Sequence, residues 1–144
     1  MDSFFTTPIS QIMVTKVITI NMNDQFSKVE ELLRLHGIRH LPVVDDHNVM
    51  RGIITQRDLY RIISPMRNEE GSSFYNKDIL NEYILKYVMT KEVVTLSPQE
   101  TLGAVISLMV KTKYGCIPVL DAEKHLLGIV TQVDVLRAIA KHIE

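Results

Sequence analysis

The sequence predicts a mixed α/β (α+β) fold, in which two β-α-β-β-α repeats pack about an approximate twofold axis. The first observation is a repeat: shifting the chain by 76 positions aligns residues 12–63 with residues 88–139 without a gap, and 15 of the 52 pairs are identical. The second is that each copy contains three short apolar runs of strand length. The third is that residues with helical apolar spacing separate these runs in the same order in both copies.

The first strand of each copy is predicted from the β-branched runs Val17–Ile20 and Val93–Leu96. Apolar residues at helical spacing follow each run and predict one buried helix face per copy. These residues are Phe26, Val29, Leu32 and Leu33 in the first copy, and Leu102, Val105, Ile106 and Met109 in the second. Ser97-Pro98-x-Glu100 predicts the start of the second of these helices, with a polar cap and a proline in the first turn.

The second strands are predicted at Leu41–Val44 and Ile117–Leu120, each followed by an aspartate that begins a turn. The third strands contain Gly52 and Gly128 and lead directly into the last helix of each copy. That helix is expected to bury an apolar face. The face consists of Leu59, Ile62 and Ile63 in the first copy and of Val135, Leu136, Ile139 and Ala140 in the second.

The domain organisation follows from the repeat: residues 1–66 form repeat 1, residues 67–84 a linker with a short helix, and residues 85–144 repeat 2. Pro65, Gly71 and two adjacent glutamates make Ser64–Asn76 an exposed connection. Ile79, Leu80, Tyr83, Ile84 and Tyr87 have helical spacing and predict the linker helix. A single repeat is too small to bury its apolar surface well, so the two are expected to share a core and to form a ligand cleft between them.

Composition excludes several classes of function. The net charge of −1 with interspersed signs predicts no nucleic-acid partner and no anionic membrane partner. No apolar run is long enough to span a bilayer, and the single cysteine indicates a reducing compartment, so a cytoplasmic protein is expected. His36 and His40 have the spacing of a zinc pair, but Gly37 breaks the helix that such a pair needs, and no metal site is expected. No glycine-rich phosphate motif and no nucleophile–base arrangement occurs, so no catalytic residues, no required cofactor and no enzymatic activity are expected.

The most informative motif is Thr-x-x-Asp, which occurs at Thr55–Asp58 and at Thr131–Asp134. In both copies it stands where the third strand meets the last helix, so a hydroxyl, a carboxylate and helix N–H groups converge there. Such a junction can hold a hydroxyl-rich or anionic small molecule. The same spacing is also that of a capping box, in which the two side chains serve only their own helix.

These motifs together resemble the CBS domain, named for cystathionine β-synthase, and the whole chain resembles the tandem pair called a Bateman module. The resemblance rests on Met13-Val14 and Met89-Thr90 before the first strands, on the apolar-x-Pro-Val-x-Asp blocks, and on Gly-Ile-Ile/Val-Thr-x-x-Asp. It implies a regulatory sensor of AMP, ADP or ATP, in which the aspartates accept the ribose hydroxyls and strand residues enclose the adenine. S-adenosylmethionine is the alternative ligand. The implied binding residues are Ile18, Thr19, Ile38, Arg39, His40, Pro42, Thr55, Arg57 and Asp58 in repeat 1, and Val94, Thr95, Tyr114, Gly115, Cys116, Pro118, Thr131 and Asp134 in repeat 2.

The resemblance also implies how these residues combine. Residues 38–42 and 114–118 would each form one wall of an adenine pocket. Asp134 would bind the ribose of a ligand held by the 38–42 wall, and Asp58 that of a ligand held by the 114–118 wall. A homodimer is implied through helices, with apolar residues of Phe26–Leu35 and Ile79–Tyr87 available for the contact. An unidentified regulated protein would respond to the ligand.

The two copies differ in charge at their candidate sites. Repeat 1 has Arg39 and Arg57, whereas the matching residues of repeat 2 are Gly115 and Val133. Since phosphate recognition favours arginine, two unequal sites are expected, with phosphate held in repeat 1. The arginines also fit an ordinary solvated surface, and Tyr114 fits interface packing as well as it fits adenine stacking.

Three hypotheses about function remain at this point. The chain is a ligand-sensing regulatory module, a ligand-free dimerisation or docking module, or a small enzyme that acts on a nucleotide. The third has the least support because the sequence offers no general base or nucleophile pair.

Overall fold

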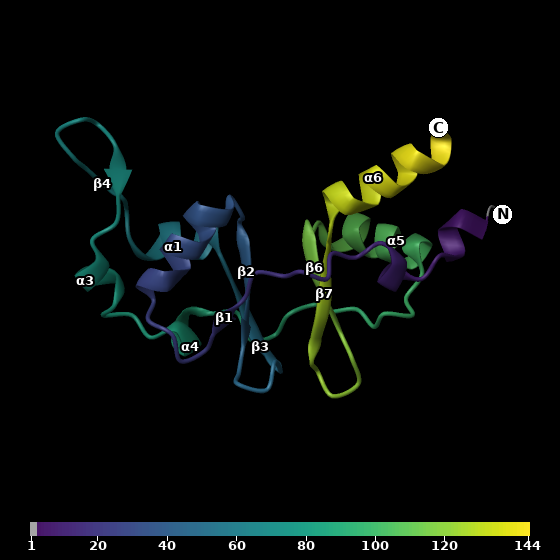
Figure 1. Cartoon of the computed structure of the whole chain (residues 1–144), viewed down its shortest axis with the longest axis horizontal. Coiled ribbons are helices and arrows are strands. Elements are labelled where there is room, and N and C mark those ends of the chain that lie inside the picture. The colour runs from purple at the N-terminus through teal and green to yellow at the C-terminus, as the bar shows by residue number, and fades with distance from the viewer. Residues whose placement is uncertain (1–2) are drawn as a thin grey trace. The chain divides into compact units, whose positions relative to one another are not determined.

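A computed structural model describes residues 3–144 (Figure 1). Its first half contains the 3-10 helices η1 (Ser3–Thr6) and η2 (Ile9–Gln11), then β1 (Ile20–Asn21), α1 (Ser27–His36), β2 (His40–Val44), β3 (Met50–Thr55) and α2 (Gln56–Ile62). The connection contains β4 (Met66–Arg67), β5 (Ser73–Phe74), α3 (Lys77–Leu80) and α4 (Leu85–Val88). The second half contains α5 (Leu102–Thr112), β6 (Cys116–Leu120), β7 (Leu126–Thr131) and α6 (Gln132–Ile143). The mixed α/β character and the duplicated element order agree with the prediction, and the twofold axis stays a prediction.

The chain divides into two compact units, and each unit combines parts of both halves of the sequence. The central unit is Ile18–Val93. The terminal unit joins the N-terminal segment, which ends at Val17, to Val94–Glu144. Each repeat therefore packs with the segment that precedes the other repeat. We call residues 3–14 and 77–90 the lead-in segments.

Backbone pairing connects each lead-in segment to the strands of its unit. In the central unit β1 is parallel to β2, β2 is antiparallel to β3, and Thr90 pairs with Ile53 through two hydrogen bonds of 2.9 Å. In the terminal unit β6 and β7 form an antiparallel hairpin. Val14 pairs there with Ile129 through hydrogen bonds of 2.8 and 2.9 Å. In Figure 1, α5 and α6 lie on the same side of the β6–β7 hairpin.

Two glycines make room for the lead-in segments. A Cβ at Gly52 would lie 2.6 Å from the Thr90 carbonyl oxygen, and a Cβ at Gly128 would lie 2.6 Å from the Val14 carbonyl oxygen. Distances this short are not tolerated against backbone. The repeated glycines therefore serve the close approach of the lead-in backbone rather than a ligand.

The predicted first strands are shorter than expected. Only Ile20 and Asn21 form β1, and in the second copy only Leu96 reaches the sheet, as an isolated parallel bridge with Val119. The prediction for Val93–Leu96 is therefore wrong except for its last residue. The reason is that these runs contain the points at which the chain leaves one unit for the other, so most of each run serves as a connection.

The predicted helix faces are buried, one in each unit. Phe26, Val29 and Leu33 have exposed fractions of 5% or less in the central core. Leu102, Val105 and Met109 line the terminal core. Ile9 of the N-terminal lead-in segment (0% exposed) and Leu85 of the other lead-in segment (1% exposed) complete these cores. Since the apolar face of α1 is used internally, the expected dimer contact on Phe26–Leu35 retains only Leu35 as a large exposed apolar side chain.

The start of α5 differs from the prediction. The cap is Thr101, whose hydroxyl accepts the Ala104 N–H at 3.2 Å, rather than Ser97. The Pro98 and Glu100 carbonyl oxygens instead accept N–H groups of Ser10 and Ile9. Because the N-terminal lead-in segment takes these carbonyl oxygens, residues 97–100 form a turn and the helix begins after them.

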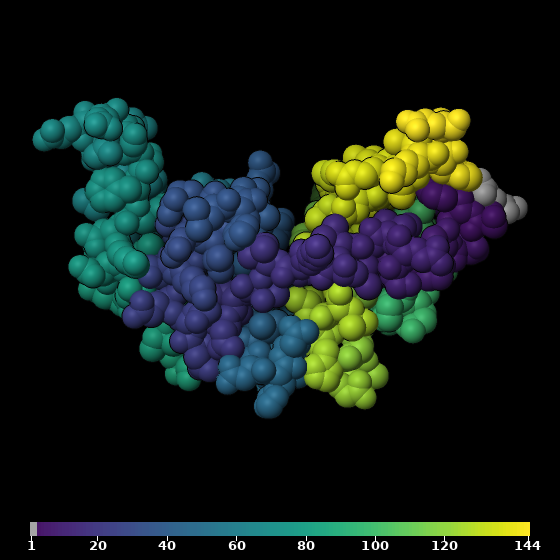
Figure 2. Space-filling view, in the orientation of Figure 1, coloured from purple at the N-terminus to yellow at the C-terminus, as the bar shows by residue number. Residues whose placement is uncertain are grey.

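The connection between the repeats contains more structure than the linker predicted for it. β4 and β5 pair with Met66 opposite Phe74 in a small hairpin, which projects from the rest of the central unit in Figure 2. The predicted linker helix is two short helices, α3 and α4. They are separated at Asn81, whose side-chain oxygen accepts the Ser27 N–H at 2.9 Å and so caps α1.

The last helices also depart from the predicted faces. α2 ends at Ile62, and Ile63 is extended. In α6, Val135 is buried, but Leu136 is 64% exposed and Ala140 is also exposed. Within residues 3–144, no helix has the length and apolar character needed to cross a lipid bilayer.

Candidate functional site

The first Thr-x-x-Asp motif joins β3 to α2 and forms a complete capping box. The Asp58 Oδ2 atom accepts the Thr55 N–H at 2.9 Å, and the Thr55 hydroxyl oxygen accepts the Asp58 N–H at 3.2 Å. The other carboxylate oxygen, Oδ1, lies 3.7 Å from an Arg61 guanidinium nitrogen. The Arg61 side chain is 70% exposed, so this contact is weak and can rearrange.

The second motif joins β7 to α6 in the same way. The Asp134 Oδ2 atom accepts the Thr131 N–H and the Thr131 hydroxyl, both at 2.8 Å. Its Oδ1 atom lies 3.3 Å from an Arg137 guanidinium nitrogen. Asp134 is only 8% exposed, which is unusual for a carboxylate and requires this set of hydrogen bonds.

Both aspartates therefore perform the capping role that one interpretation of the motif predicts. The capping hydrogen bonds use Oδ2 and leave Oδ1 facing an exposed arginine. A carboxylate oxygen accepts more than one hydrogen bond, so a ligand hydroxyl can bind without removing the cap. The two interpretations of Thr-x-x-Asp are compatible.

The beginning of the preceding strand lies beside each capping box. His40 is the register partner of Thr55, and the Gln56 N–H donates to the Arg39 carbonyl oxygen at 2.9 Å. Cys116 is the register partner of Thr131, and the Gln132 N–H donates to the Gly115 carbonyl oxygen at 3.0 Å. The structure thus brings each candidate wall next to the capping box of its own repeat. The expected combination of wall and aspartate from different repeats stays a prediction.

The remaining candidates have different degrees of burial. Ile18, Ile38 and Val94 are half-buried against the core of their own unit. Pro42 and Pro118 are buried within β2 and β6. Thr19 is half-buried, Thr95 is exposed, and the Tyr114 side chain is 51% exposed. The prolines have little exposed surface, whereas Thr19, Thr95 and Tyr114 retain surface that a ligand or a partner can contact.

The surfaces around the two capping boxes differ in charge. We call them the edge at Thr55, with Arg39 and Arg57, and the edge at Thr131, with Gly115 and Val133. Arg39 and Arg57 are exposed and make no ion pair within residues 3–144, in contrast to Arg61 and Arg137. At the matching positions the other edge has Gly115 and a Val133 that is 58% exposed. The edge at Thr55 is consequently cationic, and the edge at Thr131 is more apolar.

His40 and Cys116, which occupy matching positions of the two repeats, are uncharged at neutral pH. Burial, and to a smaller extent the nearby Arg39 charge, lowers the pKa of His40 from its ordinary value of 6.5. Burial, reinforced by the Asp134 carboxylate, raises the pKa of the Cys116 thiol to about 11. A thiol with this pKa is a poor nucleophile, so Cys116 acts as a small apolar side chain at this edge.

Sequence reasoning did not select Arg61 and Arg137, which face the open carboxylate oxygens. They form one of the identical pairs of the internal repeat, and this identity is the signal that could have identified them. Gln132 was also missed. Its side chain is the nearest group to a Cβ placed at Gly115, at 3.7 Å.

Comparisons with known proteins agree with the duplicated architecture. The family model for the CBS domain matches residues 9–65 and 85–141. A CBS domain-containing protein of Dictyostelium discoideum is 31% identical over 137 residues, which are 94% of this chain and 93% of that protein. The chain belongs to the CBS domain family and contains a tandem pair of these domains.

Other relatives are longer proteins or isolated domain pairs. The L-aspartate semialdehyde sulfurtransferase of Methanocaldococcus jannaschii is 30% identical over 131 residues, but the chain spans only 23% of its length. The solved CBS domain pair of protein MJ0100, in complex with 5′-methylthioadenosine and S-adenosyl-L-methionine, superposes with a TM-score of 0.74 at 27% identity. That superposition covers 95% of this chain and 98% of the other.

Proposed function

We propose that this chain is a regulatory module that binds the adenosine part of AMP, ADP or ATP at its Thr-x-x-Asp edges and transmits the bound state to a partner protein. The observation that carries the proposal is the duplicated aspartate, which is fixed through Oδ2 and whose Oδ1 atom faces only an exposed arginine, Arg61 or Arg137. The domain pair of MJ0100, at 27% identity, supports an adenosine ligand, because both of its bound compounds contain adenosine.

A ribose diol suits this arrangement physically. A hydroxyl that donates to a carboxylate makes a charge-assisted hydrogen bond, which contributes about 1.5–3 kcal/mol. The capping hydrogen bonds hold each aspartate in one orientation before a ligand arrives, so little side-chain entropy is lost on binding. A fixed acceptor next to half-buried apolar residues matches a sugar joined to an aromatic base.

The phosphate is assigned to the edge at Thr55. Arg39 and Arg57 have no carboxylate partner within the described residues, and both belong to the segments joined by the Gln56–Arg39 backbone hydrogen bond. Guanidinium groups without an internal partner are available to a phosphate. The edge at Thr131 lacks arginine at these positions, so it suits an uncharged or cationic adenosine compound such as S-adenosylmethionine.

Isothermal titration calorimetry of the full chain tests the proposal. We expect binding of AMP, ADP or ATP with unequal affinities at the two edges. Asp58→Asn and Asp134→Asn keep the size of the side chain and weaken the charged acceptor, and each should reduce affinity at its own edge by about tenfold or more. If neither substitution changes the affinity of any adenosine compound, the proposal is wrong.

Exchanging the unequal residues tests the assignment of phosphate. Arg57→Val copies Val133 and should lower the affinity for AMP relative to adenosine by about tenfold, whereas Val133→Arg should raise it at the other edge. Arg67→Val is the matched control, because Arg67 is an exposed arginine of β4, outside both edges. If Arg67→Val lowers the affinity for AMP equally, the effect comes from the net charge of the protein and not from a phosphate contact of Arg57.

A docking or dimerisation role is the second candidate, and an exposed apolar stripe on α6 supports it. Val133, Leu136, Ala140 and Ile143 are spaced by three, four and three residues, so they lie on one side of the helix. Leu136 and Ile143 are 64% and 77% exposed. A second copy of the chain could cover this stripe with its own stripe in a symmetric dimer.

Sedimentation velocity separates the two candidates. Leu136→Glu should convert a dimer into a monomer without changing adenosine binding. Val110→Glu is the control, since Val110 is an exposed apolar residue (74%) of α5 that lies outside both segments expected to form the dimer contact. A dimer that persists in the Leu136 variant would refute the α6 contact.

A further inference from the structure

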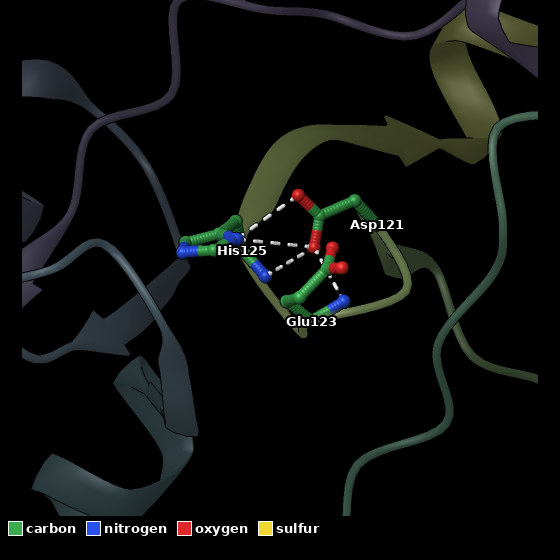
Figure 3. Close-up of side chains that lie close together, drawn as sticks. All are labelled: Asp121, Glu123 and His125. Carbon is green, nitrogen blue, oxygen red and sulfur yellow. Dashed lines mark hydrogen bonds and ion pairs between the residues drawn. The ribbon is translucent and has the colours of Figure 1, made fainter.

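The turn between β6 and β7 gathers three potential metal ligands. Asp121, Glu123 and His125 offer one ligand atom each, and these atoms all lie within 4.8 Å of one another. Figure 3 shows the Asp121 carboxylate and the His125 ring directed toward each other, with Glu123 beside them. The turn is at the opposite end of the β6–β7 hairpin from Cys116 and Thr131, so this cluster is separate from the edge at Thr131.

Backbone hydrogen bonds fix the orientation of the Asp121 carboxylate. Its Oδ1 atom accepts the Glu123 N–H at 3.0 Å and the His125 N–H at 2.8 Å. The His125 Nδ1 atom lies 3.0 Å from Oδ2 and 3.2 Å from Oδ1, so the ring pairs with the carboxylate, mainly through Oδ2. One carboxylate oxygen therefore holds the turn, and the other meets a side chain that can also bind a cation.

The equivalent turn of the first repeat shows what occupies this place when the protein supplies its own cation. Asp45 accepts the His47 and Val49 N–H groups in the same way, at 2.9 and 3.1 Å. Its Oδ2 atom accepts two N–H groups of Arg51, at 2.9 and 2.7 Å. Residue Leu127 stands at the position of Arg51 in the second repeat, and Glu123 and His125 stand at those of His47 and Val49.

The two turns thus have the same backbone hydrogen bonds, but different side chains face the Oδ2 atom of the aspartate. The first turn brings a fixed guanidinium to the free oxygen. The second turn has Leu127 in place of that arginine, has Glu123 where the first has His47, and places the His125 imidazole where the first has Val49. Two carboxylates and one imidazole around a common point form a ligand set suited to a divalent transition-metal ion.

We propose that Asp121, Glu123 and His125 bind a divalent transition-metal ion of the zinc type at the end of the β6–β7 hairpin. The ion takes the place that Arg51 occupies in the first repeat. Ligand atoms around a tetrahedral zinc ion lie about 3.3 Å apart, given bonds of about 2.0 Å. The separation of His125 Nδ1 from Asp121 Oδ2 is already near this value, and Glu123 is exposed and free to rotate toward the ion.

Calorimetric titration of the full chain with zinc chloride in a buffer without phosphate or chelator is the test. Cobalt(II) provides a second readout, because ligation by the site changes its visible absorption. We expect one ion per chain. His125→Val copies Val49 and keeps the N–H that Asp121 accepts, and it should lower the affinity by about tenfold or more.

Leu127→Arg provides the sharper variant, since it copies Arg51 and supplies the internal cation. It should abolish zinc binding while preserving the turn. Glu123→Gln gives an independent measurement if the arginine variant does not fold. His36→Gln is the matched control, because His36 is an exposed histidine at the end of α1, and it should bind zinc as the unaltered chain does.

Three results would overturn the proposal: no saturable binding of zinc tighter than about 1 mM, unchanged affinity in the His125 and Glu123 variants, or a loss of affinity in the His36 control. The nucleotide titrations are independent of these outcomes, since Glu123, His125 and Leu127 lie near the other end of the hairpin. Failure of one proposal therefore leaves the other intact.

Discussion

The two compact units bury their lead-in segments at equivalent positions, and they differ in charge around their capping boxes. Ile9 fills the terminal core as Leu85 fills the central core, 76 positions further along the chain. Gly128 admits the Val14 backbone as Gly52 admits Thr90. At the edges, however, Arg39, His40 and Arg57 are matched by Gly115, Cys116 and Val133.

This contrast separates the residues that maintain the fold from those that confer specificity. The identical pairs, such as Thr55 with Thr131 and Asp58 with Asp134, cap helices and also present the open carboxylate oxygen. Near those carboxylates, the first repeat has Arg39 and Arg57 where the second has Gly115 and Val133. One duplicated scaffold can therefore present two chemically different edges, and substitutions at matched positions test each unit separately.

The largest effect is expected from truncating the buried lead-in residues. Ile9→Ala and Leu85→Ala each remove a fully buried aliphatic side chain and should each lower the free energy of unfolding by about 2–5 kcal/mol. Ile9 belongs to the sequence of the first repeat but packs in the terminal unit. Hydrogen exchange should therefore show reduced protection in residues 94–144 for the Ile9 variant and in residues 18–63 for the Leu85 variant. The reverse pattern would contradict the exchange of lead-in segments between the repeats.

A smaller effect is expected from filling the glycine contacts. Gly52→Ala and Gly128→Ala each push against a lead-in carbonyl oxygen and should cost about 1–3 kcal/mol, measured by urea unfolding. Gly115→Ala is the control, because the nearest atom to its added Cβ is a Gln132 side-chain atom at 3.7 Å. Equal costs at all three glycines would mean that the close approach of the lead-in backbone is not the cause.

Removing the capping aspartates should have a still smaller effect, and an unequal one. Asp58→Ala and Asp134→Ala each break a capping box, which costs about 0.5–2 kcal/mol. We expect the larger loss for Asp134, which is more buried and accepts an additional hydrogen bond from the Thr131 hydroxyl. Thermal unfolding without ligand measures this difference. A larger loss for Asp58 would show that the extra hydrogen bond contributes nothing.

The sequence allowed the repeat, the second and third strands and the capping boxes to be predicted, because short-range patterns and self-similarity determine them. The exchange of lead-in segments was not predictable in this way. Residues 3–11 and 79–87 share no identical pair at the repeat spacing. Tertiary packing, which a local sequence pattern does not show, determines which core each segment joins. The same docking places the N-cap of α5 at Thr101 rather than Ser97, since the lead-in segment takes the Pro98 and Glu100 carbonyl oxygens.

The candidate site was predictable to a similar extent. The motif identified Asp58 and Asp134, but it could not decide which oxygen caps the helix and which stays open. That division depends on the approach of Thr131 and Arg137, and on the equivalent groups in the other unit. The motif also did not allow burial to be predicted, although burial differs between the half-buried His40 and the buried Cys116.

The smallest effect concerns this last pair and depends on pH. Burial lowers the pKa of His40 in the folded protein below its unfolded value of 6.5, so the unfolded chain takes up a proton first as the pH falls. Stability from this residue is present above the unfolded pKa and is lost as the pH falls through it. His40→Cys copies the other unit and should flatten the loss of unfolding free energy between about pH 7.5 and about pH 5.5. Since the other histidines are present in both proteins, the difference between the two profiles isolates His40. Parallel profiles would mean that His40 is protonated as easily in the folded protein as in the unfolded chain.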